Sequence, residues 1–495
     1  MIDKNLHTKL CETRAAIETT FFHDAYYLIV VLAAFASRSH ICLLGTRGTG
    51  KTHLAKALLR TVDPAITATQ QGYLSADFEQ VLAAPKVAQL MQGIEEVTFR
   101  KLATARVKMI DEIQRLGMAA LSAFFRILDD GAVEYLGQER QVEEHFTIAT
   151  ANPTERDSDT LNITIPEPLW DRFAAVVWVP IARLKDQMKI NGNVKKALDA
   201  IEPIWTEKDL LALWTDVREN VTVSKELEYT TTLMLRIPSI CIKGQGYDGS
   251  SLEPEKKRAK CAECNQNYLC SKVLTPPSLR LKLAYLEMSK GFAYVAGRDS
   301  VNMKDLEDAF PVVFWKRLTF MDEDEITDRL TALRAFFKLL TKEMQEAQEA
   351  VELAYELKQK YTAAKMQELE TAANAKVWLI EAVDDVKSHQ EHVRAQLKTR
   401  QAQAKQKNDS DELSKISDLA SEVLPSQDAK AFHHNEPQTI PLTAQTVAEL
   451  AAVDLELFKR AKVAFDAKQT SMTLTDEEAR RVRAKRTKPN KQKAK

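Results

Sequence analysis

The sequence predicts an α/β fold, a parallel sheet flanked by helices, followed by a long α-helical region. Two observations predict the sheet. The apolar run at 41–44 leads through a glycine-rich turn into a helical pattern, and two further strand-like runs end in polar residues, at Asp111-Glu112 and at Asn152. A third observation predicts the helices. Between residues 312 and 424 there is no glycine or proline, and Ala, Glu, Lys, Gln and Leu predominate, as in long helices.

Composition and charge restrict the class of protein. The chain has 495 residues, 45% of them hydrophobic and only 14 of them glycine, so we expect about two to four mainly helical domains. The formal net charge of −1 gives no overall field that would steer the protein to nucleic acid or to a membrane. The longest apolar run, Ala25 to Ala36, is too short to span a bilayer and predicts a buried helix. With no signal pattern at its start, the chain is expected to be cytoplasmic.

The glycine-rich turn has the pattern G-x-x-x-x-G-K-[ST] between a strand and a helix, the setting in which it binds phosphates. Its glycines let backbone N–H groups surround a phosphate chain at the positive end of the helix. Lys51 is expected to reach the β- and γ-phosphates, and Thr52 to bind Mg²⁺. The predicted ATP-binding residues are Gly45, Thr46, Gly48, Thr49, Gly50, Lys51, Thr52, His53 and Asp111.

An acidic pair follows the second strand, in which Lys108 interrupts an otherwise apolar run. Asp111 is placed to hold Mg²⁺, since the ion needs a carboxylate. Glu112 can polarise a water against the γ-phosphate as a general base. A GTPase switch or a small-molecule kinase does not need this acid, but an ATP hydrolase does. Asn152 ends the next strand, where it can orient the attacking water. Arg172, in IPEPLWDRF, would by itself be an ordinary surface residue.

Taken in order, these motifs resemble the MoxR branch of the AAA+ ATPases. The resemblance covers about residues 5–315 and rests on GTRGTGKT, MIDEIQR, GAVEYLGQERQV, ATANP and IPEPLWDRF, followed by a tail that is similar to the family's lid. It implies an α/β ATPase core over 1–180 and a helical lid over 181–315. It also implies a ring, usually of six subunits, with ATP at the subunit interfaces.

The resemblance also assigns residue roles. Asn152 corresponds to sensor 1, and Arg172 to the arginine finger that enters the neighbouring subunit's site. Such a finger can raise the hydrolysis rate by about 10³–10⁵-fold. Arg280 corresponds to sensor 2, although Leu279 stands where the family has proline. Arg115 follows the acidic pair as in the family, where an interface role is a weaker expectation.

Two insertions fit the same branch. Residues 130–145 are expected to form a β-hairpin, and an extra element is expected near 70–104, within the second helix. In the wider clade such loops face the pore of the ring, where ATP-driven motion meets a target. The usual sequence of the second insertion is replaced here by ATQQGYLSADFEQVLAAPKVAQLMQG, so its contacts cannot be carried over.

A cysteine cluster lies within the lid region, in a polar insertion at 240–272. Cys261 and Cys264 have the spacing of a metal knuckle, and Cys241 and Cys270 flank them. Four thiolates suit a structural Zn²⁺. Free thiols, a redox pair or an iron–sulfur cluster remain alternatives, and nothing in the family resemblance requires a metal here.

The remainder is expected to form a helical or coiled-coil arm at 316–424, a linker at 425–442, one helix at 443–470 and a disordered basic tail at 471–495. A 4-3 apolar spacing runs from Ile326 to Ala354, which suits a helical hairpin or docking on another protein. The last 16 residues carry nine basic side chains and no acid. Such a tail can bind nucleic acid or an acidic partner, or only keep the chain soluble.

The sequence leaves three candidate functions. The first is a Mg²⁺-dependent ATPase ring that remodels a protein partner, which the resemblance extends to chaperones acting with von Willebrand factor A-domain proteins. The second is a nucleic-acid motor, favoured by the basic tail but opposed by the near-neutral charge and the lack of a recognisable binding module. The third is a scaffold with an inactive site, which the complete set of catalytic residues opposes. The first is the predicted function.

Overall fold

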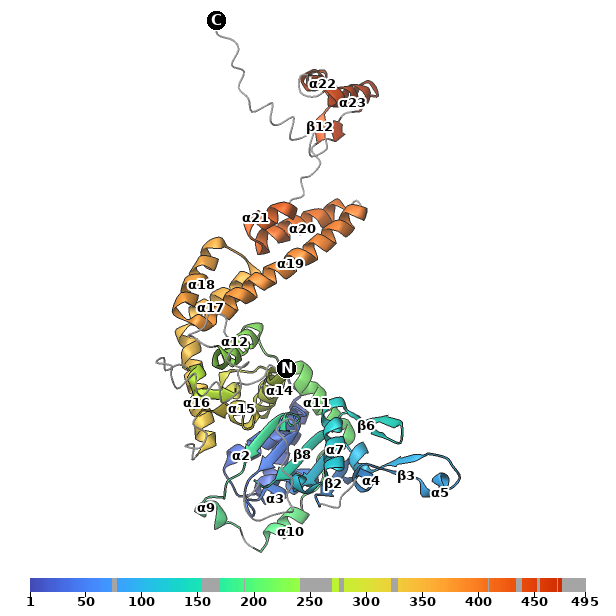
Figure 1. The fold of residues 1–495 in the computed structure, drawn as a ribbon, viewed down its shortest axis with the longest axis vertical. Helices are drawn as coiled ribbons and strands as arrows, with labels where there is room; N and C mark the ends of the chain where they lie inside the picture. The colour runs from blue at the N-terminus through green and yellow to red at the C-terminus, as the bar shows by residue number, and fades with distance from the viewer. Residues whose placement is uncertain are drawn as a thin grey trace. The chain divides into compact units, whose positions relative to one another are not determined.

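The computed structural model describes residues 1–73, 78–153, 170–190, 192–240, 269–275, 280–321, 328–407, 409–432, 439–451, 455–469 and 471–473. The chain divides into two compact units, Met1–Gln348 and Glu349–Lys495. The first unit contains the sheet and the helices around it (Figure 1). The second unit is built mainly from helices.

A five-stranded sheet with the order β2-β5-β8-β1-β9 forms the centre of the first unit, and all its strand pairs are parallel. The strands are β1 (Ile41–Leu44), β2 (Thr67–Gln71), β5 (Val107–Asp111), β8 (Phe146–Ala151) and β9 (Ala175–Trp178). Every residue of β1, β5 and β8 is buried, as in sheets covered by helices on both faces. The predicted α/β fold is confirmed. Because the strands are parallel, their carboxyl ends meet at one edge of the sheet.

The helices next to the sheet are α1 (Lys4–Glu18), α2 (Ala25–Ala36), α3 (Lys51–Arg60) and α7 (Met118–Asp130), with the 3₁₀ turns η1 (Pro64–Ile66) and η2 (Ile113–Arg115). The apolar run predicted as a buried helix is α2, of which residues 30–36 have no exposed surface. Among the described residues, no helix is long and apolar enough to cross a membrane.

The region after the sheet is helical and is fixed to α1 and α2. Its elements are α9 (Leu184–Gln187), α10 (Val194–Asp199), α11 (Glu207–Asn220), α12 (Lys225–Arg236), η3 (Ile237–Ser239), η5 (Leu269–Lys272), β10 (Val273–Thr275), α14 (Arg280–Val295), α15 (Met303–Val313), β11 (Thr319–Phe320) and α16 (Arg329–Glu346). Helix α14 packs on α2 so closely that a Cβ atom at Gly291 would lie 2.2 Å from the Ala33 carbonyl oxygen. The indole N–H of Trp214 also donates to the Phe35 carbonyl, at 3.0 Å.

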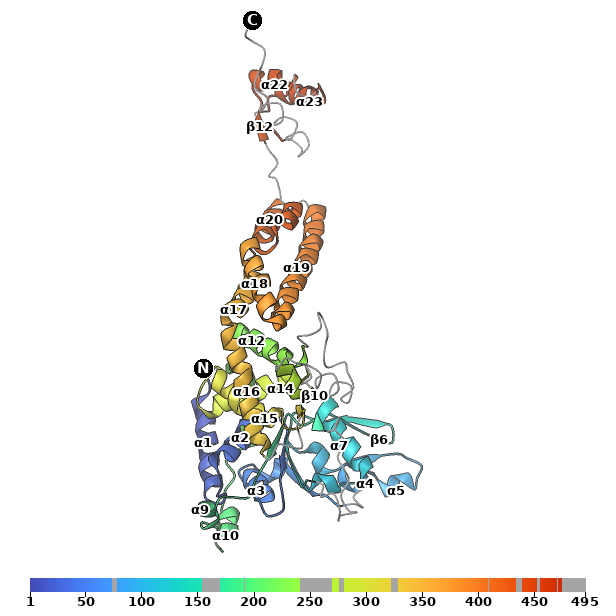
Figure 2. The ribbon, with the colours of Figure 1, turned by 60° about the vertical axis from the view of Figure 1, so that its left-hand side comes forward.

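Both predicted insertions are present. Strands β6 (Ala132–Tyr135) and β7 (Gln138–Gln141) form an antiparallel hairpin. Its two turn residues, Leu136 and Gly137, both have positive φ, as tight hairpins require. The second insertion comprises α4 (Phe78–Val81), β3 (Ala83–Pro85), α5 (Val87–Leu90), β4 (Val97–Phe99) and α6 (Lys101–Thr104). The two hairpins project from the same side of the sheet (Figure 1 and Figure 2).

The second unit corrects two expected boundaries. Its first helices are α17 (Gln348–Gln359), α18 (Ala363–Ala375), η7 (Val377–Leu379), α19 (Ile380–Lys407), α20 (Ser410–Val423), α21 (Ser426–Ala429) and η8 (Lys430–Phe432). Part of the expected linker is therefore helical, because Ala429 and Phe432 complete an apolar cluster with α19 and α20. The single helix expected at 443–470 is a packed pair, α22 (Ala444–Ala451) and α23 (Leu455–Asp466), with a small sheet of β12 (Thr439–Pro441) and β13 (Ser471–Thr473).

The 4-3 apolar spacing is divided between two helices. Helix α16 ends at Glu346, so the spacing does not follow one continuous helix. The buried members on either side of this break are Leu333, Phe337, Leu340, Met344, Ala347, Val351 and Ala354. Helix α16 packs against α15 and α12 and belongs to the first unit. The expected arm therefore begins after α16, and Ile326 lies outside the described residues.

Lys108 is fully buried on β5, an inner strand of the sheet. Its ammonium group donates to the Ala105 carbonyl oxygen, and its strand neighbour is Thr147 on β8. Burial, with a smaller effect of the Arg106 charge, lowers the pKa of Lys108 to about 7. The unfolded chain retains the ordinary lysine pKa, so it binds a proton more tightly than the folded chain between about pH 7 and 10.

We therefore expect Lys108→Met to stabilise the fold at pH 7, by on the order of a few kcal/mol. The gain should shrink as the pH rises toward 10, because the unfolded lysine then loses its proton too. Urea unfolding at pH 7 and pH 9.5 measures this difference. Lys101→Met, at an exposed lysine, is the control. An equal effect of Lys108→Met at both pH values would contradict the explanation.

Candidate active site

The loop between β1 and α3 has a backbone that only glycine adopts without strain. Gly48 and Gly50 have φ values of 80° and 85°, in the left-handed region that other residues rarely adopt. At Gly45, an added Cβ atom would lie 2.4 Å from the Val179 carbonyl oxygen. The loop leads directly into the first turn of α3, and the N–H groups of such a turn can bind an anion.

Lys51 lies inside this loop. Its ammonium group donates to the carbonyl oxygens of Gly45, at 2.8 Å, and Thr46, at 2.7 Å. Burial lowers the pKa of Lys51, while the charge of Asp111 acts to raise it. His53 lies two residues further along α3. Its Nε2 atom is buried without a hydrogen-bond partner among the described residues, and burial lowers the pKa of its imidazole.

Asp111, at the end of β5, connects this strand to α3 and to β8. Its Oδ1 atom accepts hydrogen bonds from the hydroxyl groups of Thr52 and Thr150, each at 2.7 Å. The carboxylate is largely buried, with the residue 6% exposed. A buried carboxylate next to a hydroxyl group is the hard oxygen ligand set that Mg²⁺ prefers. The residues therefore fit the predicted Mg²⁺, for which Asp111 and Thr52 would be the protein ligands.

Glu112 turns away from the strand because its backbone is left-handed, with φ 53° and ψ 54°. Its N–H group donates to the Thr150 hydroxyl oxygen at 2.9 Å. Its carboxylate accepts from the side-chain amides of Asn152 and Gln71, each at 3.3 Å, and pairs with Arg115 at 2.9 Å. The predicted general base and the predicted sensor 1 residue are thus in contact.

Arg172 is placed by a different part of the first unit. Its guanidinium group pairs with Asp129 on α7, at 3.2 Å. Phe173, the next residue, is fully buried and packs edge-on against Phe125, with ring centroids 5.9 Å apart. Arg280 begins α14, but its side chain lies outside the described part of the structure.

The predicted zinc ligands are mostly outside the described residues. Cys241, Cys261 and Cys264 fall there, and only Cys270 is described, in η5. Within the described ranges, no group of three or more His, Cys, Asp or Glu side chains could hold a metal ion. The structural zinc site therefore stays a prediction.

Comparison with known proteins gives this site a family. Residues 40–173 match the family described as the AAA domain of the dynein-related subfamily. The chain contains an AAA domain. This domain includes the phosphate loop, the acidic pair, Asn152 and Arg172, and its presence supports an ATP-hydrolysing activity.

More distant similarities extend beyond the AAA domain. The chain is 22% identical over 229 residues to the uncharacterised protein YeaC of Bacillus subtilis (strain 168), and this match covers 43% of the chain and 66% of YeaC. The fold is also similar to a solved structure described as that of a candidate ATPase from Cytophaga hutchinsonii, with a TM-score of 0.52 and 18% identity. That match covers 68% of this chain and 94% of the other.

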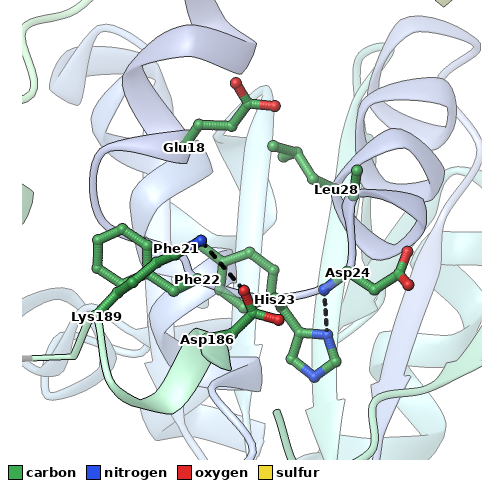
Figure 3. A pocket seen from close by; sticks show the side chains of 9 residues that line it. Glu18, Phe21, Phe22, His23, Asp24, Leu28, Asp186 and Lys189 are labelled. Carbon is green, nitrogen blue, oxygen red and sulfur yellow. Dashed lines mark hydrogen bonds and ion pairs between the residues drawn. The ribbon is translucent and has the colours of Figure 1, made fainter. Parts of the chain in front are cut away.

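A cavity of about 230 Å³ lies beside the phosphate loop of the AAA domain. Phe21 lines it, and a Cβ atom at Gly50 would lie 3.3 Å from the Phe21 ring. His23 donates from Nε2 to the Pro180 carbonyl and accepts at Nδ1 from the Asp24 N–H, so its tautomer is fixed. Figure 3 shows Phe21 and His23 in this pocket together with Asp186, whose carboxylate pairs with Lys189 at 3.3 Å.

Two residues at the AAA site were missed by the sequence analysis. Thr150 lies two residues before Asn152 on β8, and alternate residues of a strand share a face, so its position could have been found. Gln71 ends β2, whose residues TATQQ are polar and only partly buried. No sequence pattern identifies β2 as the strand beside β5, so the contact between Gln71 and Glu112 needed the structure.

We expect Thr150→Val to lower kcat about tenfold and to raise the Mg²⁺ concentration needed for half-maximal activity. Valine has the shape of threonine but no hydroxyl, so the Glu112 N–H loses its acceptor and Asp111 loses a donor. Kinetics over a Mg²⁺ titration measure both effects. Thr147→Val on the same strand is the control, because the buried hydroxyl of Thr147 has no hydrogen-bond partner within the described ranges. Equal kinetics for the two variants would refute the role of Thr150.

Proposed function

We propose that this protein is a MoxR-like AAA+ ATPase that assembles into a ring, with six subunits as the expected number, and remodels or activates a protein partner. The observation that carries this proposal is the group formed by Asp111, Glu112 and Asn152 at the carboxyl edge of the sheet. In this group, the Asp111 carboxylate would bind the metal ion, and the Glu112 carboxylate, which contacts Asn152, would activate a water. A switch protein or a small-molecule kinase has no use for the second carboxylate.

The proposed ATP position follows the geometry of the loop. The phosphates would lie against the N–H groups of the loop and of the first turn of α3, where Lys51 neutralises their charge. Adenine would occupy the cavity beside Phe21, since an aromatic ring and a buried acceptor such as the Asp186 carboxylate suit a purine that carries an amino group. Arg280, at the start of α14, would add a cation from the lid.

Hydrolysis follows from this arrangement. Glu112 accepts a proton from water as the water attacks the γ-phosphate, and Asn152 holds the Glu112 carboxylate in place. Mg²⁺, when bound to Thr52 and Asp111, supplies positive charge to the phosphate oxygens. Arg172 would act on the ATP of the adjacent subunit, where it neutralises charge on the transferred phosphoryl group.

The insertions offer a surface for a protein target. At the tip of the β3–β4 hairpin, Val87 is 66% exposed, Met91 85% and Ile94 53%. Exposed apolar side chains gathered at one tip favour contact with a protein. A partner with a von Willebrand factor A domain is proposed by analogy with the MoxR branch.

A nucleic-acid-dependent motor is the second candidate. Helix α23 exposes Lys459, Arg460 and Lys462 within four residues, and the basic tail follows it in the sequence. Stimulation of ATP hydrolysis by DNA or RNA would support this candidate. Such stimulation should decline steeply between low and moderate salt, because binding to phosphates releases counterions.

Mass photometry of the Glu112→Gln variant tests the proposed assembly. The variant should bind ATP without consuming it, so ATP should produce particles of about six times the 55.9-kDa chain, without added DNA or RNA. ADP or no nucleotide should yield smaller particles. A single-chain mass in all three conditions, together with full ATPase activity of the wild type at the same concentration, would contradict the ring.

A further inference from the structure

Arg317, which follows α15, is almost completely buried, with its side chain 5% exposed. Its guanidinium group donates to four residues. Nε contacts the Asp171 carboxylate at 3.1 Å, and the two terminal nitrogens contact the carbonyl oxygens of Asp171, at 2.8 Å, Phe173, Ala174, at 3.1 Å, and Val313, at 3.2 Å. Three of these four residues belong to the segment that carries Arg172.

The segment Asp171–Phe173 is therefore fixed on both sides of Arg172. Arg317 binds the backbone carbonyl and the side chain of Asp171 and the backbone carbonyl of Phe173. The Phe173 ring is anchored in the core against Phe125. Arg172 itself points to Asp129 near the surface, with its side chain 26% exposed. A fixed backbone with one outward guanidinium suits a group that must reach another molecule.

The segment around Arg317 is held in turn by α16. Arg329, the first residue of α16, donates to the carbonyl oxygens of Trp315, at 2.7 Å, and Leu318, at 2.5 Å. Lys316 lies 5.8 Å from the centre of the Trp170 ring. Helices α15 and α16 lie side by side (Figure 2), and α15 also packs on α14, which begins at Arg280. The lid helices thus reach the Arg172 segment through a short series of contacts.

We propose that Arg317 is a positioning residue for Arg172: it fixes the backbone from which the arginine finger reaches the neighbouring subunit's ATP. This inference rests on the proposed function, in which Arg172 acts between subunits. An arginine suits this position because its rigid fork of five N–H donors can bind several acceptors at once, whereas lysine carries a single nitrogen. The role differs from that of Arg172, since the buried Arg317 cannot itself touch the neighbour's nucleotide.

The predicted effect of Arg317→Gln is a kcat at least tenfold lower with ATP affinity within about twofold of the wild type. The defect should lie in the finger and not in the subunit's own site. Adding the Glu112→Gln protein, which has an inactive site but an intact finger, should therefore restore hydrolysis above the sum of the two proteins alone. Asp171→Asn, which changes only a partly exposed carboxylate, should show a smaller loss with the same rescue, even if Arg317→Gln fails to fold.

Two controls separate the possible failures. Arg298→Gln removes another lid arginine, one that pairs with Asp305 at the start of α15, and should leave kcat within about twofold. Arg172→Ala mixed with Glu112→Gln tests the finger itself. If that mixture gives no rescue, the intersubunit finger is wrong and the inference falls with it. If that mixture is rescued while folded Arg317→Gln and Asp171→Asn are not, only the role of Arg317 is overturned.

Discussion

Glu112→Gln is expected to lower kcat for ATP hydrolysis by about 10²–10⁴-fold, the range for loss of a general base. Glutamine keeps the size of the side chain and can still accept from Asn152, but it takes no proton from water. ATP binding should remain, because Lys51, Thr52 and Asp111 are unchanged. Steady-state phosphate release and the Kd for ATP measure the two effects separately.

Glu134→Gln is the matched control for this variant. Glu134 lies on the β6–β7 hairpin, where its exposed carboxylate pairs with Arg126 at 3.1 Å. The change in charge is the same, but Glu134 lies on a different element and contacts Arg126 instead of the acidic pair. Hydrolysis by Glu112→Gln within threefold of the wild type would show that another group accepts the proton, and the central assignment would be wrong.

Arg172→Ala should reduce kcat by about 10³-fold or more, because an arginine finger contributes about 10³–10⁵-fold to phosphoryl transfer. The Kd for ATP should change little, since in the proposed mechanism each subunit binds ATP mainly with its own loop. Arg172→Lys should restore little, because lysine has the charge but not the planar fork. Single-turnover hydrolysis with saturating ATP measures the chemical step.

A nearby arginine provides the control for the Arg172 prediction. Arg126 lies on α7, the helix that also carries Asp129, and its side chain is 49% exposed. Arg126→Ala should leave kcat within about threefold. Similar losses for Arg126→Ala and Arg172→Ala would indicate a general effect of charge on that surface, and the finger assignment would fail.

The parts of the site that sequence predicted are those formed by contiguous residues. The phosphate loop needs glycine at positions whose backbone the structure shows to be left-handed, Gly48 and Gly50. The sequence predicted the acidic pair at the end of a buried strand, and the buried strand β5 does end at Asp111. Parallel strands then place Asn152 beside Glu112, which is a consequence of the fold class. Their catalytic roles stay predictions until activity is measured.

The parts that sequence did not predict depend on contacts between distant segments. Arg317 lies 146 residues after Asp171. Nothing in the sequence around it predicts that this arginine is buried. The helix boundaries in the second unit also differ from the prediction. Composition suggested a linker at 425–442, but Phe432 packs into an apolar cluster. Local sequence patterns identify a loop or the end of a strand. They do not identify the distant oxygen atoms to which a buried guanidinium group donates its hydrogen bonds.

If each ATP site is completed by a neighbouring subunit, specific ATPase activity must depend on protein concentration. Hydrolysis per chain should be close to zero at concentrations where mass photometry with ATP shows single chains. It should rise in parallel with the fraction of assembled particles, with no DNA or RNA present. A constant, high activity per chain across the range, including conditions where only single chains are observed, would show that one chain hydrolyses ATP without a neighbour.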